Sequence, residues 1–79
     1  MSQSIQTDVI KLIHLETGTE IKKIQPESDL INDLGMDSMD VSGLIGSIEN
    51  HFHIKITAND AATLNTVQEL IQFIEKQQQ

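Results

Sequence analysis

One serine in this chain stands where its hydroxyl could carry a covalent modification. The segment 33–40 reads Asp-Leu-Gly-Met-Asp-Ser-Met-Asp, so Gly35 allows a sharp turn and a helix begins at or beside Ser38. Free backbone N–H groups and the helix dipole favour negative charge at such a position. A phosphodiester on Ser38 would therefore be stabilised by the helix end.

The residues alone leave other roles open for this serine. Serine is a preferred helix cap, and capping explains most serines that precede a helix. Asp37 and Asp40 oppose an added anion, although they could instead present carboxylates to a modifying enzyme or its metal ion. A hydrolase that uses Ser38 is disfavoured, because the sequence lacks Gly-x-Ser-x-Gly and so small a domain offers little to shield an oxyanion site.

Two groups of polar residues contain potential metal ligands, but neither has the pattern of a metal site. His51 and His53 are two positions apart, with His14 as a third candidate, but no nearby residues complete a site. The acidic segment 29–33 lacks the spacing of a calcium-binding loop. We therefore predict surface positions for the histidines and turn or cap roles for Asp29, Asn32 and Asp33.

Length and composition indicate one small domain, residues 1–79, with an aliphatic core. A hydrophobic fraction of 38% suits a globular chain, and two Phe without Trp or Tyr leave the core to aliphatic side chains. Twelve acidic and five basic residues give a net charge of −7, which argues against nucleic acid and anionic membranes as partners. The charge favours basic protein surfaces, or it serves solubility alone.

The chain lacks cysteine, so any thiol chemistry needs a cofactor that supplies the sulfur. The segment from Met1 to Lys11 has no basic start followed by an apolar stretch, and no apolar run approaches the length of a membrane span. We expect a cytoplasmic monomer without stable membrane insertion.

A first helix is predicted over 4–16, because residues of one face recur at helical spacing. Ser2 or Ser4 can cap its start, and Gly18 is placed to end it. The face comprises Ile5, Val9, Leu12, Ile13 and Glu16.

Residues 17–36 predict a long loop anchored on the core. Pro26 excludes a continuous helix, and one short helical turn is expected over 29–33, closed by Gly35. Loops with their own apolar residues pack back on the domain and are often functional. The expected anchors are Ile21, Ile24, Leu30, Ile31 and Leu34.

A second helix is predicted over 38–52. Its apolar stripe consists of Val41, Leu44, Ile45, Ile48 and Phe52. The opposite face is small or polar: Ser42, Gly43, Gly46, Ser47 and Asn50. Each glycine within a helix costs about 0.8–1 kcal/mol relative to alanine, so either another group approaches this face closely or the helix tolerates the loss.

The remaining residues predict an extended segment over 53–56, a short helical turn over 57–63 and a last helix. Thr66 and Glu69 form a capping box at its start, and 76–79 is expected to be a frayed tail. The fold class is therefore all-α: a small bundle of three main helices plus a short one, with a long loop between the first two main helices. Its core should join Val41, Ile45, Ile48 and Phe52 to Val9, Leu12, Ile13, Leu70, Ile71 and Ile74.

The run Asp-Leu-Gly-Met-Asp-Ser-Met-Asp resembles the Asp-Leu-Gly-x-Asp-Ser-Leu-Asp attachment motif of the acyl carrier protein family, with Met39 in place of the usual Leu. The similarity extends to Thr66-Val67-Gln68 and covers nearly the whole chain; the matching residues between are Leu44, Glu49, Phe52 and Ile56. It implies that phosphopantetheine is joined to Ser38 by a phosphodiester and carries acyl groups as thioesters. Implied partners are a phosphopantetheinyl transferase and acyl-transferring and chain-elongating enzymes with basic docking surfaces.

The helix after the attachment serine departs from the family pattern, which has several acidic residues that dock partner enzymes. Only Asp40 and Glu49 are acidic here. Ser42 stands where the family usually has an aliphatic residue near its acyl-binding cleft; either this turn of the helix faces water, or the cleft is less suited to a long chain. The pathway is therefore open among general fatty-acid synthesis and dedicated polyketide, modified-lipid or amino-acyl pathways. The alternative to a carrier is an unmodified helical adaptor that binds partner proteins. The other departures are Gly43, Gly46, His51 and His53.

Overall fold

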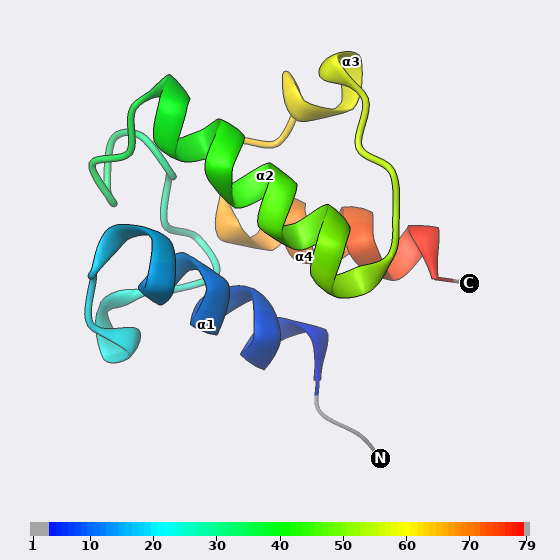
Figure 1. The fold of residues 1–79 in the computed structure, drawn as a ribbon. Helices are drawn as coiled ribbons and strands as arrows, with labels where there is room; N and C mark the ends of the chain where they lie inside the picture. Colours follow the sequence, from blue (N-terminus) through cyan, green and yellow to red (C-terminus); the bar gives the residue numbers. More distant parts are fainter. Residues whose placement is uncertain (1–3, 79) are drawn as a thin grey trace.

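The computed structural model describes residues 4–78 as an all-α bundle, which confirms the predicted fold class (Figure 1). Residues 4–78 contain no β-strand; Asp29 and Thr66 form a single isolated bridge. Every helix in this range is too short or too polar to span a bilayer. The elements are α1 (Ile5–Thr17), the 3-10 helix η1 (Ile21–Lys23), α2 (Ser38–Phe52), α3 (Ala58–Ala61) and α4 (Val67–Gln77).

The ends of α1 follow the predicted signals. The Ser4 hydroxyl accepts a hydrogen bond from Thr7 N at 3.1 Å and caps the start, whereas Ser2 lies outside the described residues. Gly18 ends the helix in the left-handed conformation, with φ of 76°, which glycine adopts without steric strain.

The bounds of α2 are those predicted, but its cap is not Ser38. Asp37 Oδ1 accepts from Asp40 N at 2.9 Å, and Asp40 Oδ2 accepts from Asp37 N at 3.2 Å. This capping box satisfies free N–H groups on both sides of the helix start. At the other end His53 is left-handed, with φ of 57°, and its N–H bonds to Glu49 O.

The long loop is anchored by fewer residues than the sequence predicted. Ile24 and Leu30 are buried, but Ile21 and Ile31 are exposed. The segment 29–33 forms hydrogen-bonded turns rather than an α-helix, with Asp29 O accepting from both Asp33 N and Leu34 N. These turns direct Leu30 inward and leave Ile31 outside. The short helix η1 was not predicted.

The C-terminal elements start where the sequence predicted. Thr57 caps α3 and Thr66 caps α4, each through a capping box. Residues 54–56 lie outside any helix or strand, as predicted, whereas His53 is a left-handed turn residue rather than part of an extended segment. The last helix continues to Gln77 and so includes two residues of the expected frayed tail over 76–79; Gln79 lies outside the described residues.

The core lies where α1 packs against α2 and α4, with α3 apart on a connecting loop (Figure 1). Four residues predicted to line the core are only half-buried: Leu12, Val41, Ile45 and Phe52. The loop contributes Met36 to the interior instead. The fully or nearly buried apolar residues are Val9, Ile13, Ile24, Leu30, Met36, Leu44, Ile48, Ile56, Leu64, Val67, Leu70, Ile71 and Ile74.

Candidate functional site

Ser38 is the first residue of α2 and is exposed. Its hydroxyl makes no hydrogen bond within residues 4–78, because the Asp37 carboxylate performs the capping that serine could have performed. The side chain therefore stands at the N-terminal end of the helix dipole without a structural bond to break. A serine in this position fits attachment of a phosphodiester.

Acidic side chains in the loop that precedes α2 are held by hydrogen bonds to the backbone. Asp29 Oδ1 accepts from Ile31 N and Asn32 N, and Asp33 Oδ2 accepts from Asp29 N at 2.7 Å. These bonds confirm the predicted turn roles of Asp29 and Asp33. They fix the loop that approaches the start of α2.

Two apolar side chains flank the serine on the surface. Met39 is 82% exposed and Ile31 is 56% exposed. Ile31 lines the same cleft as Ser38. An exposed serine between apolar side chains and carboxylates offers a partner both hydrophobic and charged contacts.

A groove runs from Ser38 along the side of α2 that faces α3. Its near cleft, of about 320 Å³, is lined by Ser38, Ile31 and Asn65 among others. Its far cleft, of about 360 Å³, is lined by Gly46 and Glu49 among others. Both clefts share Val41, Ser42 and Ala61, so we treat them as one α2–α3 groove.

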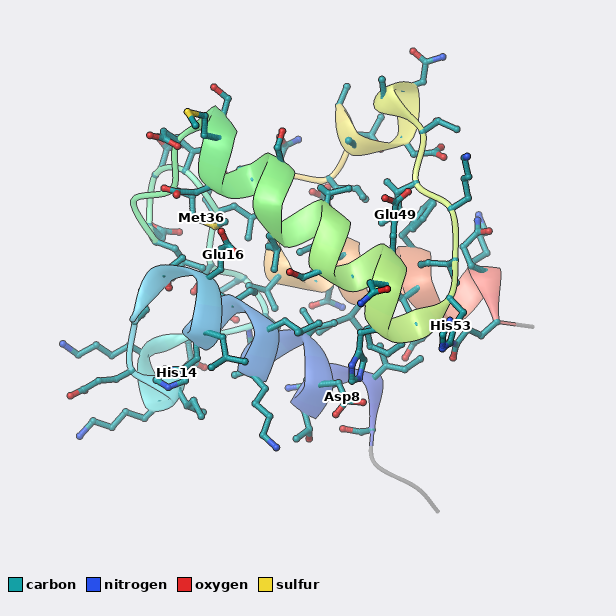
Figure 2. The ribbon with its side chains drawn as sticks, viewed as in Figure 1. Asp8, His14, Glu16, Met36, Glu49 and His53 are labelled. Atoms are coloured by element: carbon teal, nitrogen blue, oxygen red, sulfur yellow. The ribbon has the colours of Figure 1, made fainter. Side chains whose placement is uncertain are left out.

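Both acidic residues of α2 are used by the fold. Asp40 belongs to the capping box, and Glu49 Oε2 accepts from Ile56 N at 2.8 Å. The latter bond ties α2 to the segment before α3; Figure 2 shows Glu49 on α2 beside that segment. The two carboxylates that remained for partner docking therefore also hold local structure.

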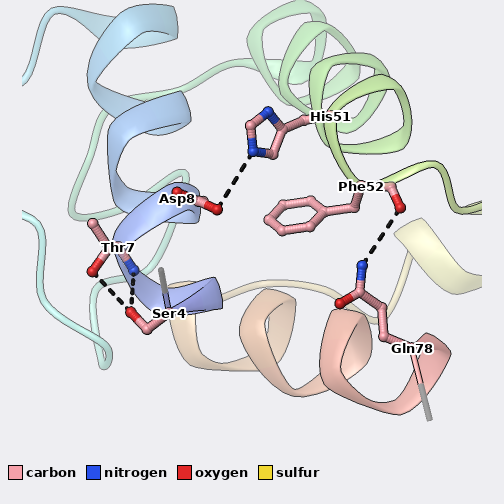
Figure 3. A network of polar contacts seen from close by, with 6 residues as sticks. All are labelled: Ser4, Thr7, Asp8, His51, Phe52 and Gln78. Atoms are coloured by element: carbon pink, nitrogen blue, oxygen red, sulfur yellow. Dashed lines mark hydrogen bonds and ion pairs between the residues drawn. The ribbon is translucent and has the colours of Figure 1, made fainter. Parts of the chain in front are cut away.

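Acidic residues of α1 lie against two α2 positions at which this chain lacks the acidic residues usual in the family pattern. A Cβ added to Gly43 would lie 2.6 Å from Glu16 Oε2, so Glu16 is the group that approaches this glycine. His51 Nε2 lies 3.5 Å from Asp8 Oδ2 (Figure 3). Around Gly46 an added Cβ would meet nothing within 4 Å.

The three histidines occupy separate structural roles. His14 Nδ1 lies 2.8 Å from Thr19 O, His53 ends α2, and His51 contacts Asp8 and packs edge-on against Phe52, with ring centroids 4.8 Å apart. Among residues 4–78, no three side chains of His, Cys, Asp or Glu are grouped as metal ligands.

Several residues of the site were not found by sequence reasoning. The role of Asp37 as the helix cap could have been predicted, because Asp-x-x-Asp is the same type of pattern that identified Thr66 and Glu69 as a capping box. The roles of Asn65 in the groove and of Glu16 beside Gly43 depend on tertiary packing. No local pattern in the sequence reports such contacts.

The chain is similar to known carriers over most of its length. A family described as "Phosphopantetheine attachment site" matches residues 7–74. An acyl carrier protein of Nitratidesulfovibrio vulgaris is 33% identical over 95% of this chain and 99% of its own length. Those of Solidesulfovibrio magneticus and Syntrophobacter fumaroxidans are 34% and 30% identical over 92% of this chain and 94% and 90% of theirs. The chain therefore belongs to the acyl carrier protein family, whose cofactor is phosphopantetheine and whose members carry acyl groups.

Proposed function

We propose that Ser38 is the attachment residue and that its phosphopantetheine arm carries acyl intermediates as thioesters. The observation that carries this proposal is the exposed, unbonded hydroxyl at the first position of α2, beside a groove that begins at the same residue. Because the chain has no cysteine, the thiol that holds the acyl group comes from the cofactor.

Attachment requires a transferase and coenzyme A as the donor. The Ser38 Oγ forms a bond to the phosphorus that bears the pantetheine, and the bond from that phosphorus to the adenosine bisphosphate breaks. The hydroxyl proton passes to a base, and the adenosine bisphosphate leaves. The backbone N–H groups at the start of α2 favour the resulting anion.

The proposed partners are the phosphopantetheinyl transferase and acyl-transferring or chain-elongating enzymes that have basic docking surfaces. The net charge of −7 supports such partners. We propose a dedicated pathway rather than general fatty-acid synthesis, because the exposed face of α2 offers Gly43 and Gly46 where charge or apolar area would serve docking.

Intact mass tests the attachment. The protein is incubated with coenzyme A and a phosphopantetheinyl transferase, and a gain of one arm is expected for the native chain and for the control Ser42→Ala. Ser38→Ala should gain nothing. A native chain that stays unmodified would support the adaptor alternative, and an arm on Ser38→Ala would place the attachment elsewhere.

A further inference from the structure

All the sulfur of this chain is in methionine. The sequence has three methionines and no cysteine, so before an arm is attached no protein thiol competes for an oxidant. Met36 is 2% exposed and belongs to the core, whereas Met39 is 82% exposed. A peroxide in solution therefore reaches the Met39 sulfur far more readily than the Met36 sulfur while the protein is folded.

Met39 lies directly beside the residue proposed for attachment. Ser38 and Met39 are the first two residues of α2, and Ile31, the other exposed apolar residue of this region, lines the same cleft as Ser38. An enzyme that closes around the Ser38 hydroxyl therefore covers Met39 as well. Burial of the apolar thioether side chain then contributes to the affinity between the two proteins.

The fold does not depend on the Met39 side chain. The cap of α2 is made by the carboxylates and backbone N–H groups of Asp37 and Asp40, and the exposed Met39 side chain takes no part in it. An oxygen added to the Met39 sulfur changes the surface next to Ser38 and leaves the core packed. An oxygen added to Met36 would instead enter a close-packed interior.

Resting on the proposed attachment at Ser38, we propose that Met39 is a reversible oxidation site whose sulfoxide hinders attachment of the arm. The Met39 sulfur forms a bond to one oxygen of hydrogen peroxide while the O–O bond breaks. The proton of that oxygen passes to the second oxygen, which leaves as water. The sulfur is oxidised by two electrons and the peroxide is reduced by two.

The sulfoxide opposes docking because it is polar. A transferase surface that buries the thioether would have to bury the sulfoxide oxygen without a hydrogen-bond partner. A methionine sulfoxide reductase reverses the change: the oxygen leaves as water and two thiols are oxidised to a disulfide. The high exposure of Met39 gives such a reductase access to the side chain.

The first test measures where peroxide reacts. The protein without its arm is treated with hydrogen peroxide, and peptide masses follow the gain of one oxygen at each methionine. In the folded protein Met39 should react at least about tenfold faster than Met36, and in urea the two rates should agree within about twofold, because unfolding removes the difference in exposure. Equal rates in the folded protein would overturn the assignment of Met39.

The second test measures attachment after the peroxide has been removed. With a phosphopantetheinyl transferase and coenzyme A, oxidation should raise the KM for the native protein about tenfold, the low end of the gain from burying a methionine side chain. The kcat should stay within about twofold, because Ser38 itself is unchanged. Treatment with a methionine sulfoxide reductase should restore the original KM.

Two variants provide the controls. Met39→Leu has the residue usual in the family pattern, which keeps the apolar area and cannot be oxidised, so peroxide should leave its KM unchanged. Met39→Gln is polar without any oxidation, and its KM should be raised before treatment. Urea denaturation of the treated native protein should give the same midpoint as the untreated protein.

An unchanged KM after oxidation of Met39, or an equal rise in treated Met39→Leu, would overturn this inference while leaving the attachment intact. A lower urea midpoint after treatment would also overturn it, because poorer attachment would then follow from unfolding. An untreated native chain that accepts no arm would instead overturn the attachment at Ser38. The oxidation rates separate these failures, because they are measured without any transferase.

Discussion

Asp37 and Ser38 divide two tasks that one residue often combines at a helix start. The aspartate carboxylate satisfies the free backbone N–H group of Asp40, and the serine hydroxyl is left for chemistry. A modified serine that also capped the helix would exchange one role for the other on attachment. Because Asp37 is the cap, attachment at Ser38, as proposed, requires no capping bond to be broken.

This division predicts different stabilities for two neighbouring variants. Ser38→Ala should change the free energy of unfolding by less than about 0.5 kcal/mol, since alanine suits an exposed first helical position. Asp37→Ala should cost about 0.5–2 kcal/mol through loss of the cap. Urea denaturation measures both, with Asp37→Asn as the control that keeps a capping oxygen. Equal losses for the two alanine variants would contradict the division.

At the scale of the elements, α2 meets two environments along its outer face. Glu16 approaches Gly43, whereas the space beside Gly46 is open. The two glycines are three residues apart in one helix and have the same intrinsic helix propensity. We therefore expect any difference in the stability effect of replacing them to arise from the contact with α1.

Replacing each glycine by alanine measures that difference. Gly46→Ala should stabilise the protein by about 0.5–1 kcal/mol, because a helical glycine loses more backbone entropy than alanine. Gly43→Ala should gain less, since the Glu16 carboxylate must move away from the new Cβ. Thermal unfolding of both variants, each repeated with Glu16→Ala, tests this expectation. Equal gains in stability at the two positions would show that the Glu16 side chain moves away from the new Cβ without cost.

The same contrast applies to partner docking. Gly46→Glu adds a carboxylate in open space and should lower the KM of a generic ketoacyl synthase about threefold at low salt, with a smaller effect at high salt. Gly43→Glu is the matched control, because its carboxylate would stand beside that of Glu16. A native chain that already matches an ordinary fatty-acid carrier in this assay would contradict the dedicated pathway.

Helix positions were predictable from sequence because the relevant signals are local. Cap residues and apolar spacing gave the same bounds for α2 as the structure. The loop was less predictable, because turns have no fixed period that separates the buried Leu30 from the exposed Ile31. Ser38 was recognised from its motif, whereas the groove beside it requires α3 to pack near α2.

In the whole molecule, stability rests on a small aliphatic core. Ile48 is 0% exposed, while Phe52 is half-buried at the end of α2. Its main chain is also tied to the C-terminus, where Gln78 Nε2 donates to Phe52 O at 3.5 Å (Figure 3). We therefore expect Ile48, although smaller than Phe52, to contribute more to the free energy of unfolding.

Truncation of each side chain tests the order. Ile48→Ala should cost about 2–5 kcal/mol, the range for a fully buried aliphatic residue. Phe52→Ala should cost less than the 3–5 kcal/mol typical of a buried aromatic, because part of its ring already contacts water. Urea denaturation compares them, and a larger loss for Phe52→Ala would mean that the end of α2 bears more of the core than its exposure indicates.

The contacts of α1 with α2 have a consequence for anyone who builds chimeric carriers. Asp8 pairs with His51 and Glu16 abuts Gly43, so opposite ends of the two helices are matched to each other. A relative's second helix grafted onto this chain would place other side chains against Asp8 and Glu16, which here contact a histidine and a glycine. The first and second helices should therefore be transplanted together, as one unit, when partner preference is to be moved between carriers.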